Sequence, residues 1–414
     1  MTLRRRRYAR LGIVAMTVEF NPLSAEFFAD PYSTYRRLRD DAPVYFNERY
    51  GFYALSRYAD VLRASRDWQT FSSAHGLRLD QLQDPGFRQP GSIIFLDPPE
   101  HDRLRALVSR AFTPRGAERW EPIVRRAARR FLDPLRGERR VDLLEEFAAP
   151  FPCEVISTIL GIPEEERQRF RHQTDLVLHR EPDDPNPTPA GVVAARQRHE
   201  MLLRLVAEKR AHPADDMISR LLQAEIEGDD GAPVRLSDEE AAVFAGLLAS
   251  AGSETVTKLL GNGIVLFDLH PDQWQRILDD PGTVPAAVEE VVRYWAPTQY
   301  QGRFSLSPSE WEGGTIPAGV PVFLVTGAAN RDEREYPDAD QFDIARDRSR
   351  SVALGFGHGI HVCIGAHLAR LESRVAFEEL RARYPRYRVD HRGLRRVQMS
   401  NVAGFSRVPV DCSR

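Results

Sequence analysis

The chain has 414 residues, of which 42% are hydrophobic, so it can bury a sizeable core in one large domain or two average ones. Its formal net charge of −3 argues against a nucleic-acid-binding protein, and no segment approaches the roughly 20 apolar residues that a membrane-spanning helix requires. Three cysteines without a pairing pattern suit a reducing compartment. We therefore expect a soluble, cytoplasmic protein that binds neither nucleic acid nor membrane.

Arginines at positions 4–7 and a short apolar run at 11–15 imitate a signal peptide weakly, so we expect a disordered leader over residues 1–20 and one domain over 21–414. Short apolar runs near residues 44–55 predict a small sheet, and helical periodicity dominates residues 99–267. Four prolines between residues 180 and 191 predict a loop, which we place over a pocket. The pattern predicts a mainly α fold with a minor β portion in a single large domain.

A long helix is predicted from residue 237 to about residue 268, a length of about 45 Å. Ser237 can cap its first turn, and Glu240 can complete a capping box. Within this apolar helix, Glu254 and Thr255 lie side by side, and a buried acid beside a hydroxyl is costly unless it has a purpose. The simpler alternatives are a salt-bridged or solvated acid and a hydroxyl bonded to its own helix.

Residues 356–365 read Phe-Gly-His-Gly-Ile-His-Val-Cys-Ile-Gly. Cys363 follows a glycine-rich turn and precedes a helical run over residues 366–384, where backbone N–H groups and the positive helix end favour a metal-binding thiolate. Cys153 and Cys412 lack such a setting and are predicted to be inert. A zinc site formed by Cys363 with three histidines is an alternative, but structural zinc sites draw on a second ligand cluster, which this chain lacks. Those histidines are His358, His361 and His367.

The loop resembles the ligand loop of the cytochromes P450, the haem-thiolate enzymes, whose pattern is F-x-x-G-x-H-x-C-x-G. All five specified positions match, at Phe356, Gly359, His361, Cys363 and Gly365. Residues 251–255 match the family's A-G-x-[DE]-T signature, and residues 290–293 match its E-x-x-R pair. The chain is similar to soluble bacterial members of this family from about residue 30 onward.

This resemblance implies the cytochrome P450 fold and a haem b (iron protoporphyrin IX) whose iron takes the thiolate of Cys363. It implies that the haem propionates are held by four residues, namely His101, Arg105, Arg303 and His361. It also implies catalytic roles for Thr255, which would hydrogen-bond dioxygen, and for Glu254, which would relay protons, while Gly252 leaves room for the oxygen. Glu290, Arg293 and Arg346 would form a purely structural clamp.

By the same resemblance, the protein is a monooxygenase that inserts one atom of O2 into an apolar small molecule. No flavin, nicotinamide or iron–sulfur signature follows the haem region, so electrons would come from a ferredoxin and a ferredoxin reductase. Nine arginines against three acids in residues 101–130 predict the ferredoxin docking surface. The alternatives are a peroxide-driven peroxygenase and a non-catalytic haem- or zinc-binding protein. The substrate pocket is predicted from residues 71–77, 180–191, 247–248, 297–301 and 403–405, which suit a polyketide, steroid, fatty acid or aromatic acid equally well.

Overall fold

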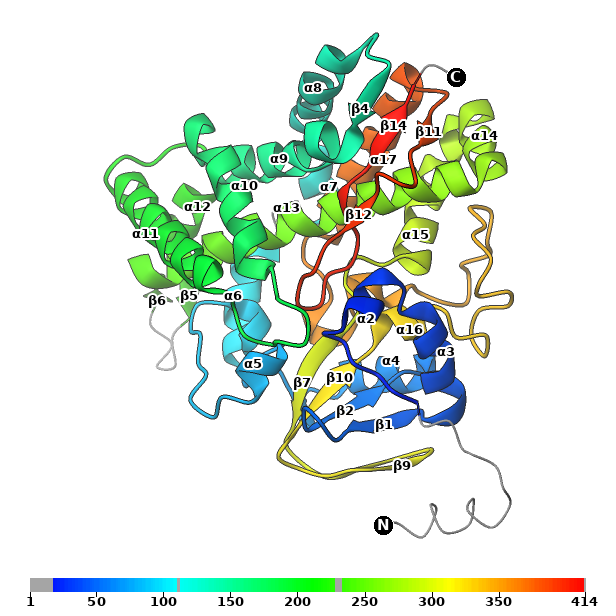
Figure 1. Ribbon diagram of the computed structural model, residues 1–414. Helices are drawn as coiled ribbons and strands as arrows, with labels where there is room; N and C mark the ends of the chain where they lie inside the picture. Colours follow the sequence, from blue (N-terminus) through cyan, green and yellow to red (C-terminus); the bar gives the residue numbers. More distant parts are fainter. Residues whose placement is uncertain (1–17, 110–111, 228–232, 413–414) are drawn as a thin grey trace.

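The structure is a computed structural model that describes residues 18–109, 112–227 and 233–412. Helices dominate the molecule (Figure 1). The α-helices are α2 (Ala25–Ala29), α3 (Tyr32–Asp41), α4 (Tyr58–Arg66), α5 (Leu79–Leu82), α6 (Glu100–Ser109), α7 (Pro114–Glu118), α8 (Glu121–Leu132), α9 (Pro150–Leu160), α10 (Glu164–Leu178), α11 (Pro189–Ala211), α12 (Met217–Gln223), α13 (Asp238–Leu269), α14 (Pro271–Asp279), α15 (Val284–Tyr294), α16 (Thr326–Ala329) and α17 (Ala366–Arg383).

The strands form one sheet of five strands and several small sheets. The large sheet has the order β1 (Val44–Asn47), β2 (Phe52–Leu55), β10 (Val320–Leu324), β7 (Gln301–Ser305) and β3 (Phe71–Ser72). A three-stranded sheet contains β11 (Arg388–Val389), β14 (Pro409–Asp411) and β4 (Arg140–Asp142). The two-stranded sheets pair β12 (Arg395–Arg396) with β13 (Phe405–Arg407), β5 (Ile226–Glu227) with β6 (Pro233–Val234), and β8 (Ser309–Trp311) with β9 (Gly314–Ile316). The prediction of a mainly α fold with a minor β portion in one large domain is confirmed.

Helix α13 crosses the whole helical part of the molecule (Figure 1). The predicted capping box starts it: the Ser237 N–H donates to Glu240 Oε2 at 3.0 Å, and the Glu240 N–H donates to Ser237 Oγ at 3.2 Å. Helices α9 and α11 pack against α13, and most of its side chains are buried. Because α13 is anchored at its capped start and packed along its length, it holds the residues at its centre in fixed positions.

The large sheet and helices α2, α3, α4 and α16 form the part drawn mostly in blue and yellow in Figure 1. Its central strand β10 pairs parallel with β2 and antiparallel with β7, so the early sheet predicted near residues 44–55 is joined by strands from much later in the chain. Residues 1–17 of the expected leader lie outside the described residues. Phe20, within the rest of that stretch, is fully buried against the rings of Phe27 and Tyr35.

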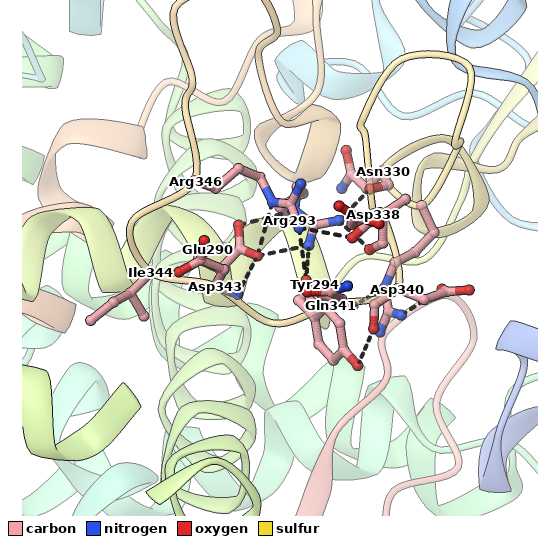
Figure 2. Close-up of polar contacts among 12 residues, drawn as sticks. Glu290, Arg293, Tyr294, Asn330, Asp338, Asp340, Gln341, Asp343, Ile344 and Arg346 are labelled. Atoms are coloured by element: carbon pink, nitrogen blue, oxygen red, sulfur yellow. Dashed lines mark hydrogen bonds and ion pairs between the residues drawn. The ribbon is translucent and has the colours of Figure 1, made fainter. Parts of the chain in front are cut away.

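The structural clamp predicted around Glu290 is present (Figure 2). Arg293 donates two hydrogen bonds to the Glu290 carboxylate, from Nε at 3.0 Å and from Nη2 at 2.7 Å. Arg346 Nε donates a third at 3.2 Å. Arg293 also donates to the carbonyls of Asn330 and Ala339. The clamp thus ties helix α15 to the segment that leads into the Cys363 loop, and it lies outside the cavity.

Over the residues that the structure describes, no helix combines the length and apolar character needed to cross a bilayer.

Candidate active site

A cavity of about 650 Å³ lies between the centre of α13 and the loop that carries Cys363. Apolar side chains from α11 and α13, among them Leu202, Leu247 and Leu248, form much of its wall. Of the predicted pocket segments, residues 247–248 and parts of 71–77 and 297–301 line it. Residues 400–402 line it in place of the predicted 403–405.

Residues 180–191, which we expected to lie over a pocket, do not line this cavity, although Leu178 at the end of α10 does. The guanidinium of Arg180 donates to the carbonyls of Pro185 and Val177. The Arg180 N–H also donates to the carbonyl of Gln398. The prolines identified a loop correctly, but a pattern of helix-breaking residues carries no information about the direction in which the loop folds.

Cys363 lines the cavity, from which its side chain is accessible. The loop before it is shaped by two glycines in the left-handed region, Gly357 with φ of +69° and Gly359 with φ of +72°. A Cβ on Gly359 would lie 2.2 Å from the carbonyl oxygen of Ser65 on α4, so only glycine fits there. The Cys363 N–H donates to the carbonyl of Phe356 at 2.8 Å, which closes the loop immediately before α17.

Burial raises the pKa of the Cys363 thiol, while the N–H of Gly365 and the charges of Arg105 and Arg370 act in the opposite direction. We expected the helix end to favour a thiolate, but burial has the larger effect on this pKa. A coordinated metal ion deprotonates a thiol outright, so Cys363 would hold an iron as a thiolate.

The four predicted propionate contacts come together beside this loop. The rings of His101 and His361 meet edge to face with centroids 4.7 Å apart, and Arg105 Nη2 donates to the carbonyl of Val362 at 2.8 Å. Burial, and then the charges of the other three members, lower the pKa of His361 to about 2. Burial also lowers the pKa of Arg303, which lies on β7, to about 10.

This cluster has the chemistry that a haem requires. Among the described residues, Arg105 and Arg303 form no ion pair with a carboxylate. The Nε2 atoms of His101 and His361 are buried without a hydrogen-bond partner from the part of the chain that the structure describes. Buried donors and cations without acceptors are costly, so they favour a ligand that brings anionic oxygens to this place. The residues present therefore fit a haem: Cys363 would bind its iron, and the four clustered residues would hold its propionates.

The zinc alternative finds no support. Throughout the described part of the chain, no three His, Cys, Asp or Glu side chains gather as metal ligands. His358 accepts a hydrogen bond from Arg66 Nε at 3.0 Å, whereas His361 packs against His101. The histidines close to Cys363 in sequence thus point to different neighbours.

Glu254 is buried and forms an ion pair with Lys258, whose Nζ lies 2.7 Å from Oε1, and the two side chains are only 5% and 4% exposed. Asp175, on α10, faces the same pair. Burial, and then the charge of Glu254, raise the pKa of Asp175 from 3.8 to about 7, against the opposing effects of Lys258 and Arg171. Lys258 could have been found from its position four residues after Glu254, but Asp175 comes from another helix and gives no sequence signal.

The raised pKa of Asp175 predicts a stability loss with rising pH. The folded protein keeps a proton that the unfolded chain releases, so the stabilising contribution is complete below about pH 4 and is lost as the pH rises to about 7. Asp175→Asn removes this loss. Melting temperatures are measured by circular dichroism. The melting temperature of the variant relative to that of the wild type should rise with pH up to about pH 7, and this difference should then stay constant. A difference that is constant over this window would contradict the assignment.

Thr255 also lines the cavity, and its hydroxyl donates to the carbonyl of Ala251 at 2.8 Å. The simpler alternative for this residue, a bond to its own helix, is thus formed, while the oxygen's lone pairs remain available to a ligand. Gly252 lines the cavity, so its role in leaving room for oxygen stays a prediction. The same position also faces α9, where a Cβ would lie 3.1 Å from Ile156 Cγ1, so a glycine here allows the two helices to approach closely.

Comparisons with known proteins agree with this site. The family model described as Cytochrome P450 matches residues 44–280 and 282–385. The erythromycin C-12 hydroxylase of Saccharopolyspora erythraea is 41% identical over 356 residues, covering 85% of this chain and 87% of that protein. The vitamin D(3) 25-hydroxylase of Pseudonocardia autotrophica is 37% identical over 409 residues, covering 95% and 96% of the two chains.

Among solved structures, a mutant of P450 EryK in complex with erythromycin B superposes with a TM-score of 0.85 at 37% identity, covering 94% of this chain and 97% of that one. The identities exceed those at which only the fold is shared, and the match spans both the cysteine loop and the centre of α13. The chain belongs to the cytochrome P450 family of haem-thiolate monooxygenases.

Proposed function

We propose that the protein binds haem b through Cys363 and inserts one oxygen atom of O2 into a largely apolar small molecule, with electrons delivered by a ferredoxin and a ferredoxin reductase. The observation that carries this proposal is the cavity in which Cys363 and Thr255 both lie. Arg105 and Arg303 also line it, and neither has a carboxylate partner among the described residues. When bound, the haem supplies the redox chemistry at its iron, and a thiolate ligand favours cleavage of the O–O bond.

The chain's own residues orient the reactants and supply protons. Thr255 presents its hydroxyl oxygen to the cavity, while Glu254 lies beside it and is held by Lys258. Asp175 is partly exposed and titrates near neutral pH, so it can take a proton from solvent and pass it toward Glu254. Leu202 of α11 and two leucines of α13, Leu247 and Leu248, give part of the cavity wall an apolar surface.

The test is a reconstitution with dioxygen labelled with heavy oxygen. A lipophilic compound is first selected because it shifts the Soret band of the haem-loaded protein, and it is then incubated with a ferredoxin, its reductase and the nicotinamide reductant. We expect one labelled oxygen atom in the product and one in water. Product that forms with peroxide and not with the ferredoxin system would favour the peroxygenase alternative. Absence of haem in the purified protein would contradict the proposal.

Fewer of the arginines in residues 101–130 are available to a ferredoxin than the sequence predicts. Arg105 turns to the Cys363 loop, and three arginines form ion pairs with glutamates, namely Arg125, Arg129 and Arg130. Arg110 lies outside the described residues. Three exposed arginines remain on or beside α7 and α8, namely Arg115, Arg119 and Arg126. These helices pack on α17, which follows Cys363 directly, so we propose that the ferredoxin docks there.

Electron transfer in this reconstitution should slow as salt is added, because attraction across an exposed surface is screened beyond a Debye length of about 10 Å. The double variant Arg119→Glu with Arg126→Glu should slow haem reduction by the ferredoxin and leave reduction by dithionite unchanged. Charge reversal at Arg220, an exposed arginine on α12, is the matched control. A reduction rate indifferent to both salt and the double variant would refute this docking surface.

A further inference from the structure

The cavity is lined by more positive charge than the haem accounts for. Arg105 and Arg303 belong to the cluster around His361, and Arg78 forms an ion pair with Asp80 at 3.2 Å. Arg198 also lines the cavity, but it comes from α11, on the wall formed with the first half of α13. Arg198 is therefore separate from the cluster around His361.

The hydrogen bonds of Arg198 are made through one nitrogen of its guanidinium. Nη1 donates to Ser250 Oγ at 2.9 Å and to Thr174 Oγ1 at 3.2 Å. Both hydroxyls give their own protons to their helices, Ser250 to the carbonyl of Gly246 and Thr174 to that of Phe170, so both are neutral acceptors. Within the described residues, Nε and Nη2 have no hydrogen-bond partner and no carboxylate pairs with the group.

Within the described residues, this partly desolvated cation has only neutral partners, namely the two hydroxyls and the ring of Phe170, whose centroid lies 5.4 Å from Cζ. Burial lowers the pKa of Arg198 to about 10, and no neighbouring acid offsets that effect, yet the guanidinium stays charged at neutral pH. Neither acid in the cavity wall pairs with Arg198: Glu254 pairs with Lys258, and burial raises the pKa of Glu372 well above its usual range. A charge held in this way gains most from a ligand that brings the opposite charge.

We propose that Arg198 binds a carboxylate of the substrate, so that the substrate class is an apolar carboxylic acid. This inference rests on the proposed monooxygenase function. The free edge of the guanidinium, Nε with Nη2, offers two parallel donors, which suit one planar carboxylate bearing a single charge. Ser250 precedes Thr255 by five residues, so the acid group would lie about 7.5 Å along the helix axis from the reacting region. The oxidised carbon would then be several bonds from the acid group, on the apolar body.

The rival explanation is that Arg198 is a structural strut that ties α10 and α11 to α13 through Thr174 and Ser250. If Arg198 is a strut, replacing it should lower the stability of the protein and weaken the binding of every ligand to the same extent. If Arg198 binds a carboxylate, replacing it should weaken the binding of acids only. The two explanations therefore separate when matched acids and amides are compared in the same variant.

The experiment uses the haem-loaded protein and a panel of straight-chain, cyclic and aryl carboxylic acids, each matched with its primary amide, with dodecanoic acid and dodecanamide as the first pair. Dissociation constants are measured by the Soret shift and, independently of the haem spectrum, by calorimetry. We expect the best acids to bind at least about tenfold more tightly than their amides. This ratio is the gain in affinity that hydrogen bonds to a charged group provide over bonds to a neutral one. Arg198→Met should abolish this ratio by weakening the acids alone, and Arg198→Lys should restore part of it.

Arg196→Met is the matched control, because Arg196 lies on the same helix with a side chain that is 74% exposed, and its removal should leave the ratio unchanged. Equal binding of acids and amides, equal weakening of both by Arg198→Met, or no binding of any acid would overturn the inference. Acids that bind through Arg198 but are not oxidised would uphold it and refute the proposed function, since binding is measured without turnover.

Discussion

Replacing Glu290 by Gln is expected to destabilise the folded protein by about 3–5 kcal/mol, because it leaves buried guanidinium groups without their counter-charge. The Glu290 side chain is completely buried, and its carboxylate receives hydrogen bonds from Arg293, from Arg346 and from the N–H of Asp343 (Figure 2). A neutral amide can accept only part of this set, and its NH2 group would face donors. The shift of the urea midpoint of unfolding measures the loss.

Glu289→Gln provides the matched control at the neighbouring position. Glu289 pairs with Arg370, but the side chains are 28% and 36% exposed, so solvent screens the pair and its loss should cost about 0–1 kcal/mol. The two variants carry the same chemical change at neighbouring positions and differ in the burial of the carboxylate. Equal shifts for both would mean that the buried clamp contributes no more than a surface ion pair.

Replacing Thr255 by Ala is expected to uncouple reductant consumption from product formation. The variant should fold and bind haem, because the change removes only one methyl group and a hydroxyl that bonds to its own helix. Without that hydroxyl, protons reach the oxygen less selectively, so product per nicotinamide oxidised should fall and hydrogen peroxide should rise. Proton-transfer groups typically contribute about 10²–10⁴ in rate, which sets the size of the effect on product formation. Product and peroxide are quantified together in each reaction.

Thr257→Ala separates this role from a general effect on the helix. The Thr257 hydroxyl donates to the carbonyl of Ser253 at 3.0 Å, the same kind of bond that Thr255 makes, but its side chain is buried away from the cavity. It should therefore keep the wild-type ratio of product to peroxide. Unchanged coupling in Thr255→Ala would instead reduce Thr255 to a helix-satisfied hydroxyl and assign proton delivery to another group.

The sequence predicted the parts of the site that depend on local order. The capping box at Ser237, the turn before Cys363 and the shared face of His101 and Arg105 each lie within a few residues, where backbone geometry fixes their relation. Arg303, on a distant strand, lies near His361, and only the family resemblance had grouped these two residues.

The parts that the sequence did not reveal depend on how separate helices pack. Asp175 approaches Glu254 from α10, and Arg198 reaches Ser250 from α11, and neither contact leaves a trace in residue spacing. The close approach of Ile156 on α9 to Gly252 is a third contact of this kind. Arginine is so frequent in this chain that no pattern distinguished Arg198 from its exposed neighbours.

The absorption spectrum of the reduced protein with carbon monoxide tests the central claim most directly. If Cys363 ligates the haem iron as a thiolate, the wild-type complex should absorb near the wavelength typical of thiolate ligation, and Cys363→Ala should lose that band while Cys153→Ala keeps it. Cys153 is the control because it is fully buried in α9, where burial raises its pKa to about 11. A wild-type spectrum without the thiolate band, or a Cys363→Ala spectrum that retains it, would contradict the assignment of this cavity as a haem-thiolate site.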